Sequence, residues 1–197
     1  MKILIDNGHG ENTPGKCSPD KSLREYAWNR EVANMICDLL QAEGYDAELL
    51  VPELEDIPLK ARCARANSFV KNTTILVSIH VNACSSGKRW YDARGWSVFT
   101  TKGITAADNL GECIWRSAER TFAPPLSVRS YSTNKLGHDF EEDFYILLHS
   151  FCPAVLIENF FMDNEEDCAY LKTANGKATC AEVAVEGIKD YLASLDE

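Results

Sequence analysis

Short apolar runs alternate along the chain with segments of helical periodicity. The first run, Ile3-Leu4-Ile5, stops at the turn residues Asp6-Asn7-Gly8. A run of this length, bounded by turn residues, is typical of a strand buried on both faces of a sheet. Five segments are predicted as strands on this basis: 3–5, 47–51, 75–79, 95–100 and 154–157.

Apolar residues recur at helical spacing between these runs. Trp28, Val32, Ile36 and Leu40 share one face of a predicted helix, and Gly44 stands where its C-terminal stop is expected. Thr105, with Asp108 three residues later, resembles a capping box that opens another helix. The predicted helices are 25–43, 59–70, one that follows Thr105, a short acidic one from Asn164, and a final one through Cys180, Ala184, Ile188 and Leu192.

The order of these elements predicts the fold class. Strands that alternate with helices favour an α/β fold with a mostly parallel central sheet and helices on both of its faces. A chain of 197 residues that is 45% hydrophobic is long enough to bury one core by itself. Residues 122–143 show no clear period, and no repeat or domain boundary interrupts the pattern. We therefore expect a single domain.

Charge and hydropathy exclude two classes of partner. The chain has 20 Lys and Arg against 30 Asp and Glu, a formal net charge of -10. This balance lacks the basic surface that binds phosphate backbones, so we expect no nucleic-acid partner. No apolar run approaches the roughly 18 residues of a membrane-spanning helix, so we expect no membrane span.

The N-terminus and the cysteines bear on the cellular compartment. Asp6 ends the first apolar run far short of the roughly 7 to 15 residues that a secretory signal requires. We therefore expect the protein to be cytoplasmic as synthesised. The eight cysteines are scattered without a CxxC pair, so we expect reduced and mostly buried thiols.

Polar residues that suit metal chemistry follow three of the predicted strands. His9 comes after the first strand, His80 after the third, and Glu158 after the run 154–157. Ligands of open α/β sheets bind outside the carboxyl ends of the strands. Two imidazoles and a carboxylate at one sheet edge are the ligand types of a zinc site with an open position.

Glu25 is a further candidate, because it begins the first helix after the loop that leaves His9. His9, Glu25 and His80 would then be three ligands, with Glu158 as the base that takes a proton from water. Spacing alone does not decide whether Glu25 or Glu158 is the ligand, because a ligand must touch the metal while a base stands off by one water.

Other reactive residues are expected to stay outside this site. His138 and His149 follow no buried strand, and the run 141–143 is interpreted as a solvated face. Nothing orients Cys84 and His80 as a nucleophilic pair. For Arg62 and Asn67, bracing of the strand ends and a plain surface role are equally compatible with the sequence.

These residues, taken in order, resemble the catalytic domain of zinc-dependent N-acetylmuramoyl-L-alanine amidases, found in bacterial cell-wall hydrolases and phage endolysins. Each block of matching residues is moderately specific by itself, but together the blocks follow one another in order over nearly the whole chain. The blocks are 3–10 (ILIDNGHG), Glu25 with Asn29, Arg62 with Ala66-Asn67, 78–83 (SIHVNA) and 153–164 (PAVLIENFFMDN).

The resemblance implies a Zn²⁺ ion held by His9, Glu25 and His80, with Glu158 as the catalytic acid and base. Zinc lowers the pKa of a water from 15.7 to about 7, and Glu158 passes its proton to the departing amine. The implied substrate is peptidoglycan, cut at the amide between the lactyl group of N-acetylmuramic acid and L-alanine. We expect a monomer that reaches the wall after release, and a phage or prophage origin fits that route.

Two alternatives remain open. A zinc peptidase that cuts the stem peptide would use the same metal and base with a different groove. A non-catalytic zinc or glycopeptide-binding module would keep the fold without turnover, although it would have no need of Glu158.

The resemblance also bears on the domain and on the substrate groove. It implies that residues 1–197 form one zinc amidase catalytic domain with no separate wall-binding domain. Two departures concern substrate detail rather than the metal: Leu148-His149 stand where the family often has a basic residue, and Asn159-Phe160 replace a usual glycine. Substrate contacts are expected in 85–94, with Trp90 and Tyr91, and around 131–144.

Overall fold

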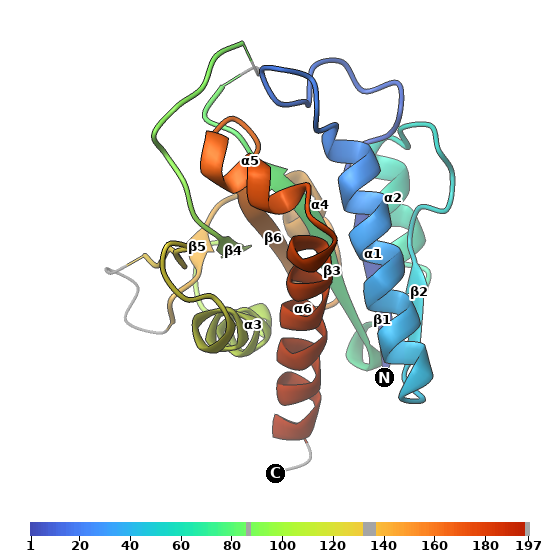
Figure 1. Ribbon diagram of the computed structural model, residues 1–197. Coiled ribbons are helices and arrows are strands. Elements are labelled where there is room, and N and C mark those ends of the chain that lie inside the picture. The colour runs from blue at the N-terminus through green and yellow to red at the C-terminus, as the bar shows by residue number, and fades with distance from the viewer. Residues whose placement is uncertain (86–87, 132–136, 196–197) are drawn as a thin grey trace.

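We analysed a computed structural model, which describes residues 1–85, 88–131 and 137–195. Its centre is a six-stranded sheet flanked by helices (Figure 1). In chain order, the elements are β1 (Lys2–Asn7), α1 (Glu25–Ala42), β2 (Asp46–Leu49), α2 (Leu59–Ala66), the 3-10 turn η1 (Lys71–Thr73), β3 (Thr74–Asn82), β4 (Ser97–Thr100), α3 (Ala107–Thr121), β5 (Phe140–Glu141), α4 (Tyr145–Leu148), β6 (Ala154–Phe161), α5 (Glu165–Leu171) and α6 (Ala174–Ser194).

The sheet has the order β2-β1-β3-β6-β4-β5. β1 is parallel to β2 and β3, and β3 is parallel to β6. β4 runs antiparallel to β6 and parallel to β5. The prediction of a mostly parallel α/β sheet is confirmed, and the carboxyl ends of β1, β3 and β6 meet at one edge.

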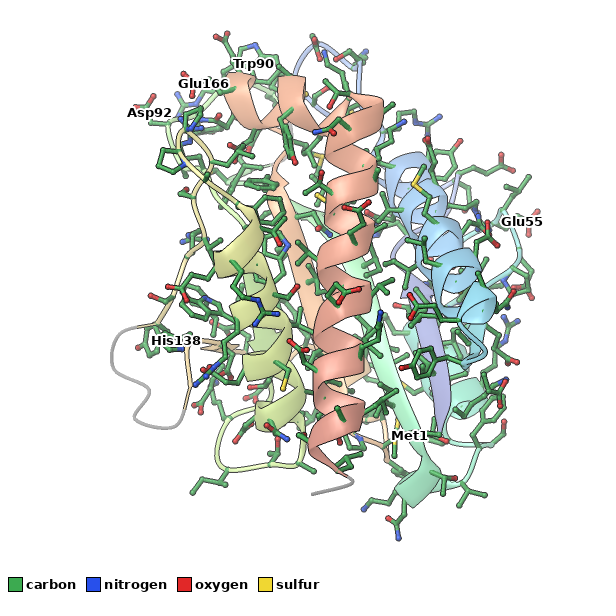
Figure 2. The ribbon with its side chains drawn as sticks, turned by 60° about the horizontal axis from the view of Figure 1, so that its bottom comes forward. Met1, Glu55, Trp90, Asp92, His138 and Glu166 are labelled. Carbon is green, nitrogen blue, oxygen red and sulfur yellow. The ribbon has the colours of Figure 1, made fainter. Side chains whose placement is uncertain are left out.

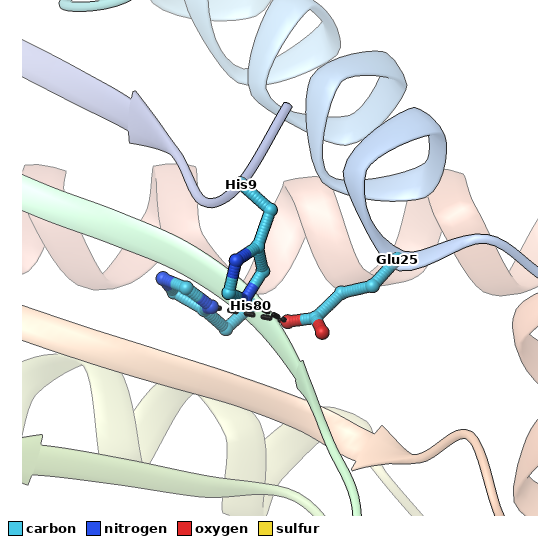
Figure 3. Close-up of side chains that lie close together, drawn as sticks. All are labelled: His9, Glu25 and His80. Atoms are coloured by element: carbon cyan, nitrogen blue, oxygen red, sulfur yellow. Dashed lines mark hydrogen bonds and ion pairs between the residues drawn. The ribbon is translucent and has the colours of Figure 1, made fainter. Parts of the chain in front are cut away.

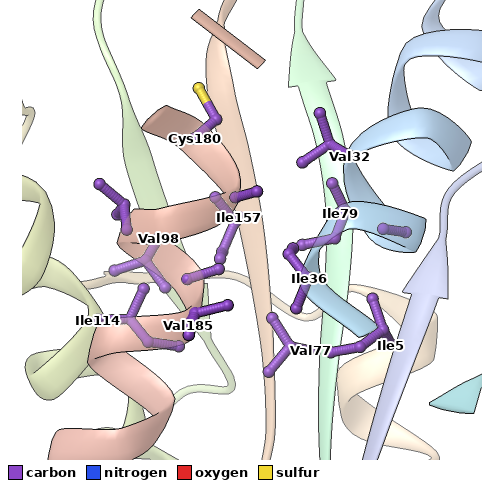
Figure 4. Close-up of a cluster of buried hydrophobic side chains, with 14 of the residues drawn as sticks. Ile5, Val32, Ile36, Val77, Ile79, Val98, Ile114, Ile157, Cys180 and Val185 are labelled. Carbon is purple, nitrogen blue, oxygen red and sulfur yellow. The ribbon is translucent and has the colours of Figure 1, made fainter. Parts of the chain in front are cut away.

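Helices cover both faces of the sheet. α6 packs between α1 and α3 on one face, and α2 contacts α4 on the other (Figure 1). The side chains of each central strand alternate between the two cores, as a strand's period of two requires. Ile5, Val77 and Ile157 belong to the larger core under α1, α3 and α6 (Figure 4). Leu4, Leu76 and Leu156 belong to the smaller core on the other face.

β3 and β6 are longer than their apolar runs predict. β3 continues through His80 to Asn82, and β6 continues through Glu158 to Phe161. The prediction that His80 and Glu158 follow their strands was therefore wrong in detail, because both lie within them. The extension arises because the two strands stay paired there, with His80 opposite Glu158, until the register shifts before Asn82 and Phe161.

Phe160 lies at this register shift and has an unusual backbone. Its φ of 59° falls in the left-handed region that favours glycine. The buried ring makes edge-to-face contacts with Phe122 and Tyr170, at centroid distances of 4.9 and 5.5 Å. Aromatic packing therefore holds a bulky residue where the resemblance expects a glycine.

Most other predicted elements are present with shifted ends. The capping box at Thr105 forms only in part: Asp108 accepts the amide of Thr105 at 3.0 Å, but Thr105 Oγ1 accepts the amide of Ala107 at 3.2 Å, and the N-cap of α3 is Ala106. α2 ends at Ala66, four residues before the predicted end, and Asn67 caps it. The short elements β5, α4 and η1 have no sequence pattern and were not predicted.

The structure bears on the expectations for the cysteines and for membrane-spanning helices. All eight cysteines are free thiols and five of them are buried. Within the described residues, none of the helices is both long and apolar enough to span a bilayer.

Candidate metal centre

Three predicted ligands meet at the carboxyl edge of the sheet. Oε1 of Glu25 lies 3.0 Å from Nδ1 of His80 and 3.4 Å from Nε2 of His9 (Figure 3). The two imidazole rings are nearly perpendicular, with centroids 4.9 Å apart. One ligand atom from each residue falls within 4.8 Å of the others. We call these three residues the His-Glu-His cluster.

Each member of the cluster comes from a different segment. His9 follows β1 in a left-handed conformation with φ of 67°, Glu25 is the first residue of α1, and His80 lies within β3. Glu25 crosses the sheet edge, where Oε1 also accepts the amide of Val81 at 3.2 Å. The convergence therefore depends on tertiary structure and on no local motif.

Glu158 lies beside the cluster. It is the direct partner of His80 in the register of β3 and β6, so both side chains leave the same face of the sheet. Its Oε2 is buried without a hydrogen-bond partner among the described residues. Burial raises the pKa of Glu158 to about 8; His80 works against this increase and the nearby Glu25 adds to it. A carboxyl group with this pKa can both accept and return a proton near neutral pH.

Within the cluster, the pKa values of Glu25 and His80 are shifted in opposite directions. Burial raises the pKa of Glu25, but its contacts with His80 and His9 outweigh this and leave that pKa below its ordinary value. Burial opposes protonation of His80, yet the Glu25 carboxylate raises the pKa of His80 above its ordinary value. Glu25 is thus an anion at neutral pH and holds two imidazoles with their ring nitrogens close together.

The donor set fits a divalent cation. Oε2 of Glu25 is buried and lacks a hydrogen-bond partner among the described residues, and an unpaired buried carboxylate oxygen is costly unless a cation is near. Two imidazoles and one carboxylate are also the set that catalytic zinc sites use with a fourth, open position. Glu25 is 2% exposed and the imidazoles 17% and 16%, so solvent reaches the ring side of the cluster.

Arg62 braces the loop that carries His9. Its buried guanidinium contacts Asp6 at 2.6 Å and Asp56 at 3.0 Å. It also donates to the carbonyls of Asn7 at 2.9 Å and His9 at 3.2 Å. Of the two roles that the sequence left open for Arg62, the structure supports the bracing one.

Gly8 leaves room for the imidazole of His80. A Cβ atom built at Gly8 would lie 2.1 Å from Cε1 of His80, much closer than atoms can approach. The Gly8 carbonyl accepts the buried Asn29 side chain at 3.0 Å, which ties this turn to α1. The close approach of Gly8 and His80 therefore requires a residue without a side chain at position 8.

The remaining candidates stay outside the cluster, as expected. His138 stacks on Trp115 with centroids 3.8 Å apart, and His149 stacks on Tyr145 at 3.9 Å. Asn67 contacts backbone atoms of His149 and Phe151 and does not brace the site. In the run 141–143, Asp143 pairs with Lys102 on the surface at 3.0 Å.

Cys84 is not activated as a nucleophile. Burial and the neighbouring Asp163 raise the pKa of its thiol, whereas a reactive cysteine needs a lowered pKa. Its amide donates to Asp163 at 3.1 Å, which fixes the chain that leaves β3.

The expected substrate loops are partly described. Residues 86–87 and 132–136 lie outside the described part of the chain. Trp90 and Tyr91 line a pocket of about 410 Å³ together with Asn164 and Glu166. Figure 2 shows Trp90, Asp92 and Glu166 close together at one end of the molecule. Substrate contact in both loops stays a prediction.

Comparison with known proteins gives the family of this chain. The fold and the His-Glu-His cluster at the carboxyl edge define an α/β protein built around a candidate metal centre. Over residues 3–190, the sequence matches the N-acetylmuramoyl-L-alanine amidase family. The chain belongs to this family, as the sequence resemblance indicated.

Individual relatives cover nearly the whole chain at moderate identity. The amidase AmiC of Escherichia coli O6:H1 is 29% identical over 97% of this chain and 52% of its own length. The endolysin of Bacillus phage SPP1 is 29% identical over 96% of this chain and 65% of its own length. The chain thus spans about half the length of the AmiC relatives that it matches.

Solved structures share the fold. An N-acetylmuramoyl-L-alanine amidase from Clostridium difficile 630 superposes with a TM-score of 0.78 at 26% identity, covering 98% of this chain and 97% of that one. AmiC2 of Nostoc punctiforme gives a TM-score of 0.83 at 24% identity, with the same coverage of both chains.

Proposed function

We propose that the protein is a zinc-dependent N-acetylmuramoyl-L-alanine amidase. It would hydrolyse the amide that joins N-acetylmuramic acid to L-alanine in peptidoglycan. The observation that carries this proposal is the convergence of His9, Glu25 and His80 at one sheet edge, with Glu158 paired to His80 in the next strand. Membership of the amidase family supports the choice of substrate.

In the proposed mechanism, His9, Glu25 and His80 would hold the ion. Zinc, when bound, supplies positive charge for the developing oxyanion and makes water acidic enough to react at neutral pH. Glu158 removes a proton from the attacking water. It then delivers that proton to the nitrogen of L-alanine, so that the peptide leaves as a neutral amine. The raised pKa of Glu158 suits both steps.

Arg62 and Gly8 position the cluster in this proposal. Arg62 fixes the backbone on both sides of Gly8 through the carbonyls of Asn7 and His9. Gly8 allows the His80 ring to approach that backbone. Neither residue exchanges a proton with the substrate.

Turbidity and product analysis test the proposal together. Purified peptidoglycan should clear with the protein, stop clearing with a chelator and clear again when zinc is restored. New N-terminal alanine in the products supports the amidase, whereas a new amine inside the stem supports the zinc peptidase. Unchanged turbidity with tight wall binding would favour the non-catalytic module.

Metal analysis tests the ligand set separately. The purified protein should hold about one zinc ion per chain, consistent with one three-ligand site. His80→Ala should lose that ion, whereas His138→Ala should keep it because His138 lies outside the cluster. Retention of zinc by His80→Ala would overturn the assignment of the site.

Three broader points belong to the same proposal. We propose that residues 1–197 act as one catalytic domain, and that the protein is a monomer. The endolysin relative supports action on the wall after release and a phage or prophage origin. Light scattering of the purified protein tests the oligomeric state.

A further inference from the structure

A second pocket lies beside the His-Glu-His cluster. It has a volume of about 270 Å³ and is lined by residues of three segments that meet at the carboxyl edge. Ala83 lies three residues beyond His80, and Met162 lies four residues beyond Glu158. The lining residues are Pro14, Gly15, Lys16, Cys17, Ala83, Ser85 and Met162. We call this space the Lys16 pocket.

The backbone connects Lys16 directly to the cluster. Gly15 and Lys16 both adopt left-handed conformations, with φ of 79° and 35°. This turn lets the Lys16 carbonyl accept the amide of Glu25 at 2.9 Å. A non-glycine residue with positive φ is uncommon and needs support from its surroundings. Lys16 is therefore placed beside the candidate metal centre by the same contact that begins α1.

The charge of Lys16 is unpaired. Its side chain is exposed, and its ammonium group makes no ion pair with any carboxylate in residues 1–85, 88–131 or 137–195. None of the other residues that line the pocket is charged. The Lys16 charge also reaches Glu158, where it works against the larger effect of burial on the pKa of that carboxyl group.

The pocket that His9 and His80 themselves line differs in charge from the Lys16 pocket. It has a volume of about 190 Å³, and Asp56, Ile57 and Arg62 also line it. Arg62 is fully engaged, since two carboxylates and three backbone carbonyls surround its guanidinium. An anionic group of a substrate is thus attracted to the Lys16 pocket, whereas Arg62 in the lining of the pocket at His9 and His80 is already paired.

We propose that Lys16 binds the free carboxylate of the second residue of the stem peptide and so selects stems with glutamate over stems with its amide. The inference rests on the proposed amidase function and adds a specificity determinant to it. An extended chain spans at most about 3.3–3.6 Å per residue, so the second residue lies within about 7 Å of the scissile amide. A lysine adjoining the cluster suits that distance.

Matched substrates test this assignment. We suggest two muramoyl tripeptides, both with L-alanine first and L-lysine amide third, whose second residue is γ-linked D-glutamate in one and its α-amide in the other. The carboxylate of the second residue is then the only one in the peptide. The zinc-loaded protein should show a kcat/KM about two- to fivefold higher for the carboxylate substrate, because an exposed charged contact contributes only that much.

In Lys16→Gln, the ratio of kcat/KM for the two substrates should fall to about one. Added salt should weaken the preference in the wild type. Lys21→Gln is the matched control, because Lys21 also has a positive φ, is exposed on the same loop and does not line the pocket. This variant should keep the preference. A preference that survives in Lys16→Gln, or that is absent from the wild type, would overturn the inference.

Binding of the free peptides separates this inference from the proposed function. The tripeptide with D-glutamate should bind the wild type more tightly than its amide in calorimetry, and Lys16→Gln should bind both equally. If neither muramoyl substrate is cleaved but this difference in binding persists, the amidase proposal fails and the anion site stands. If both are cleaved and bound without preference, only the anion site fails.

Discussion

Nη1 of Arg62 lies 2.6 Å from Oδ1 of Asp6, and both side chains are only 2% exposed. The other oxygen of Asp6 accepts the hydroxyl of Ser78 at 2.5 Å. This buried ion pair therefore links α2 to β1 and β3 directly below the turn that carries His9.

Arg62→Ala should destabilise the protein severely. The substitution leaves the Asp6 carboxylate buried without its cation and frees the carbonyls of Asn7 and His9. Loss of one partner of a buried pair costs about 3–5 kcal/mol. Urea unfolding followed by circular dichroism measures the change.

Arg65→Ala is the control for this variant. Arg65 lies on the same helix and pairs with Glu53, but the two side chains are 36% and 41% exposed. An exposed pair contributes about 1 kcal/mol or less. Equal losses in the two variants would show that the buried pair has no special role.

Gly8→Ala should weaken metal binding more than it weakens the fold. The new methyl group would overlap the His80 ring, which must rotate or shift away from Glu25. We expect zinc affinity to fall by at least about tenfold, the scale on which supporting residues affect metal sites. Competition with a fluorescent chelator gives the affinity.

Gly103→Ala is a suitable comparison, because its Cβ would meet no atom within 4 Å although its φ of 88° adds backbone strain. That variant should lose some stability and keep its zinc affinity. A Gly8→Ala protein that binds zinc normally would contradict the steric argument.

The central strands were predictable because burial on both faces leaves an uninterrupted apolar run. Segments 3–5, 75–79 and 154–157 became the cores of β1, β3 and β6. The polar continuations of β3 and β6 were not predictable, since only pairing between the strands keeps His80 and Glu158 extended. β5 has two residues and no periodicity to detect.

The candidate site was likewise predictable only in part. Position after a buried apolar run was enough to select His9, His80 and Glu158, but it set no distances and left Arg62 with two interpretations. The contacts of Arg62 depend on the fold of 56–57 against β1, which no local pattern records. The position of Lys16 beside the cluster was not predicted, because it depends on a left-handed turn after Gly15.

Zinc affinity should fall as the pH falls. The contact with Glu25 keeps the pKa of His80 above its ordinary value in the metal-free protein. A ligand imidazole must be neutral, so zinc displaces this proton. Below the raised pKa, the dissociation constant should increase about tenfold per pH unit for each proton displaced. At higher pH, where His80 is already neutral, this dependence should flatten.

Calorimetry in buffers of different ionisation enthalpy counts the released protons. His138→Asn should leave the count unchanged, because His138 contacts Glu112 and Trp115 rather than the cluster. Zinc binding that releases no proton near pH 6 would contradict the proposed role of His80.

At Phe160, substitution by glycine should destabilise the protein less than substitution by alanine, which reverses the usual order. Both changes remove a buried ring, at a cost of about 3–5 kcal/mol. Glycine also relieves the left-handed backbone, which costs other residues about 1–2 kcal/mol. Phe160→Gly should therefore unfold at a higher urea concentration than Phe160→Ala. The opposite order would show that the φ of 59° stores no strain.

Glu158→Gln should separate turnover from metal binding. Glutamine matches the size of glutamate but cannot take a proton from water or return it to the leaving amine. We expect kcat to fall about 10²- to 10⁴-fold, the usual contribution of a general acid and base. Zinc content should stay near that of the wild type, because the His-Glu-His cluster does not include Glu158.

Stability should not fall in Glu158→Gln, since the substitution removes a carboxylate whose ionisation burial disfavours. Glu182→Gln, on the exposed face of α6, is the matched control and should keep full activity. Loss of zinc together with activity in Glu158→Gln would instead make Glu158 a ligand, the alternative that the spacing of the sequence left open.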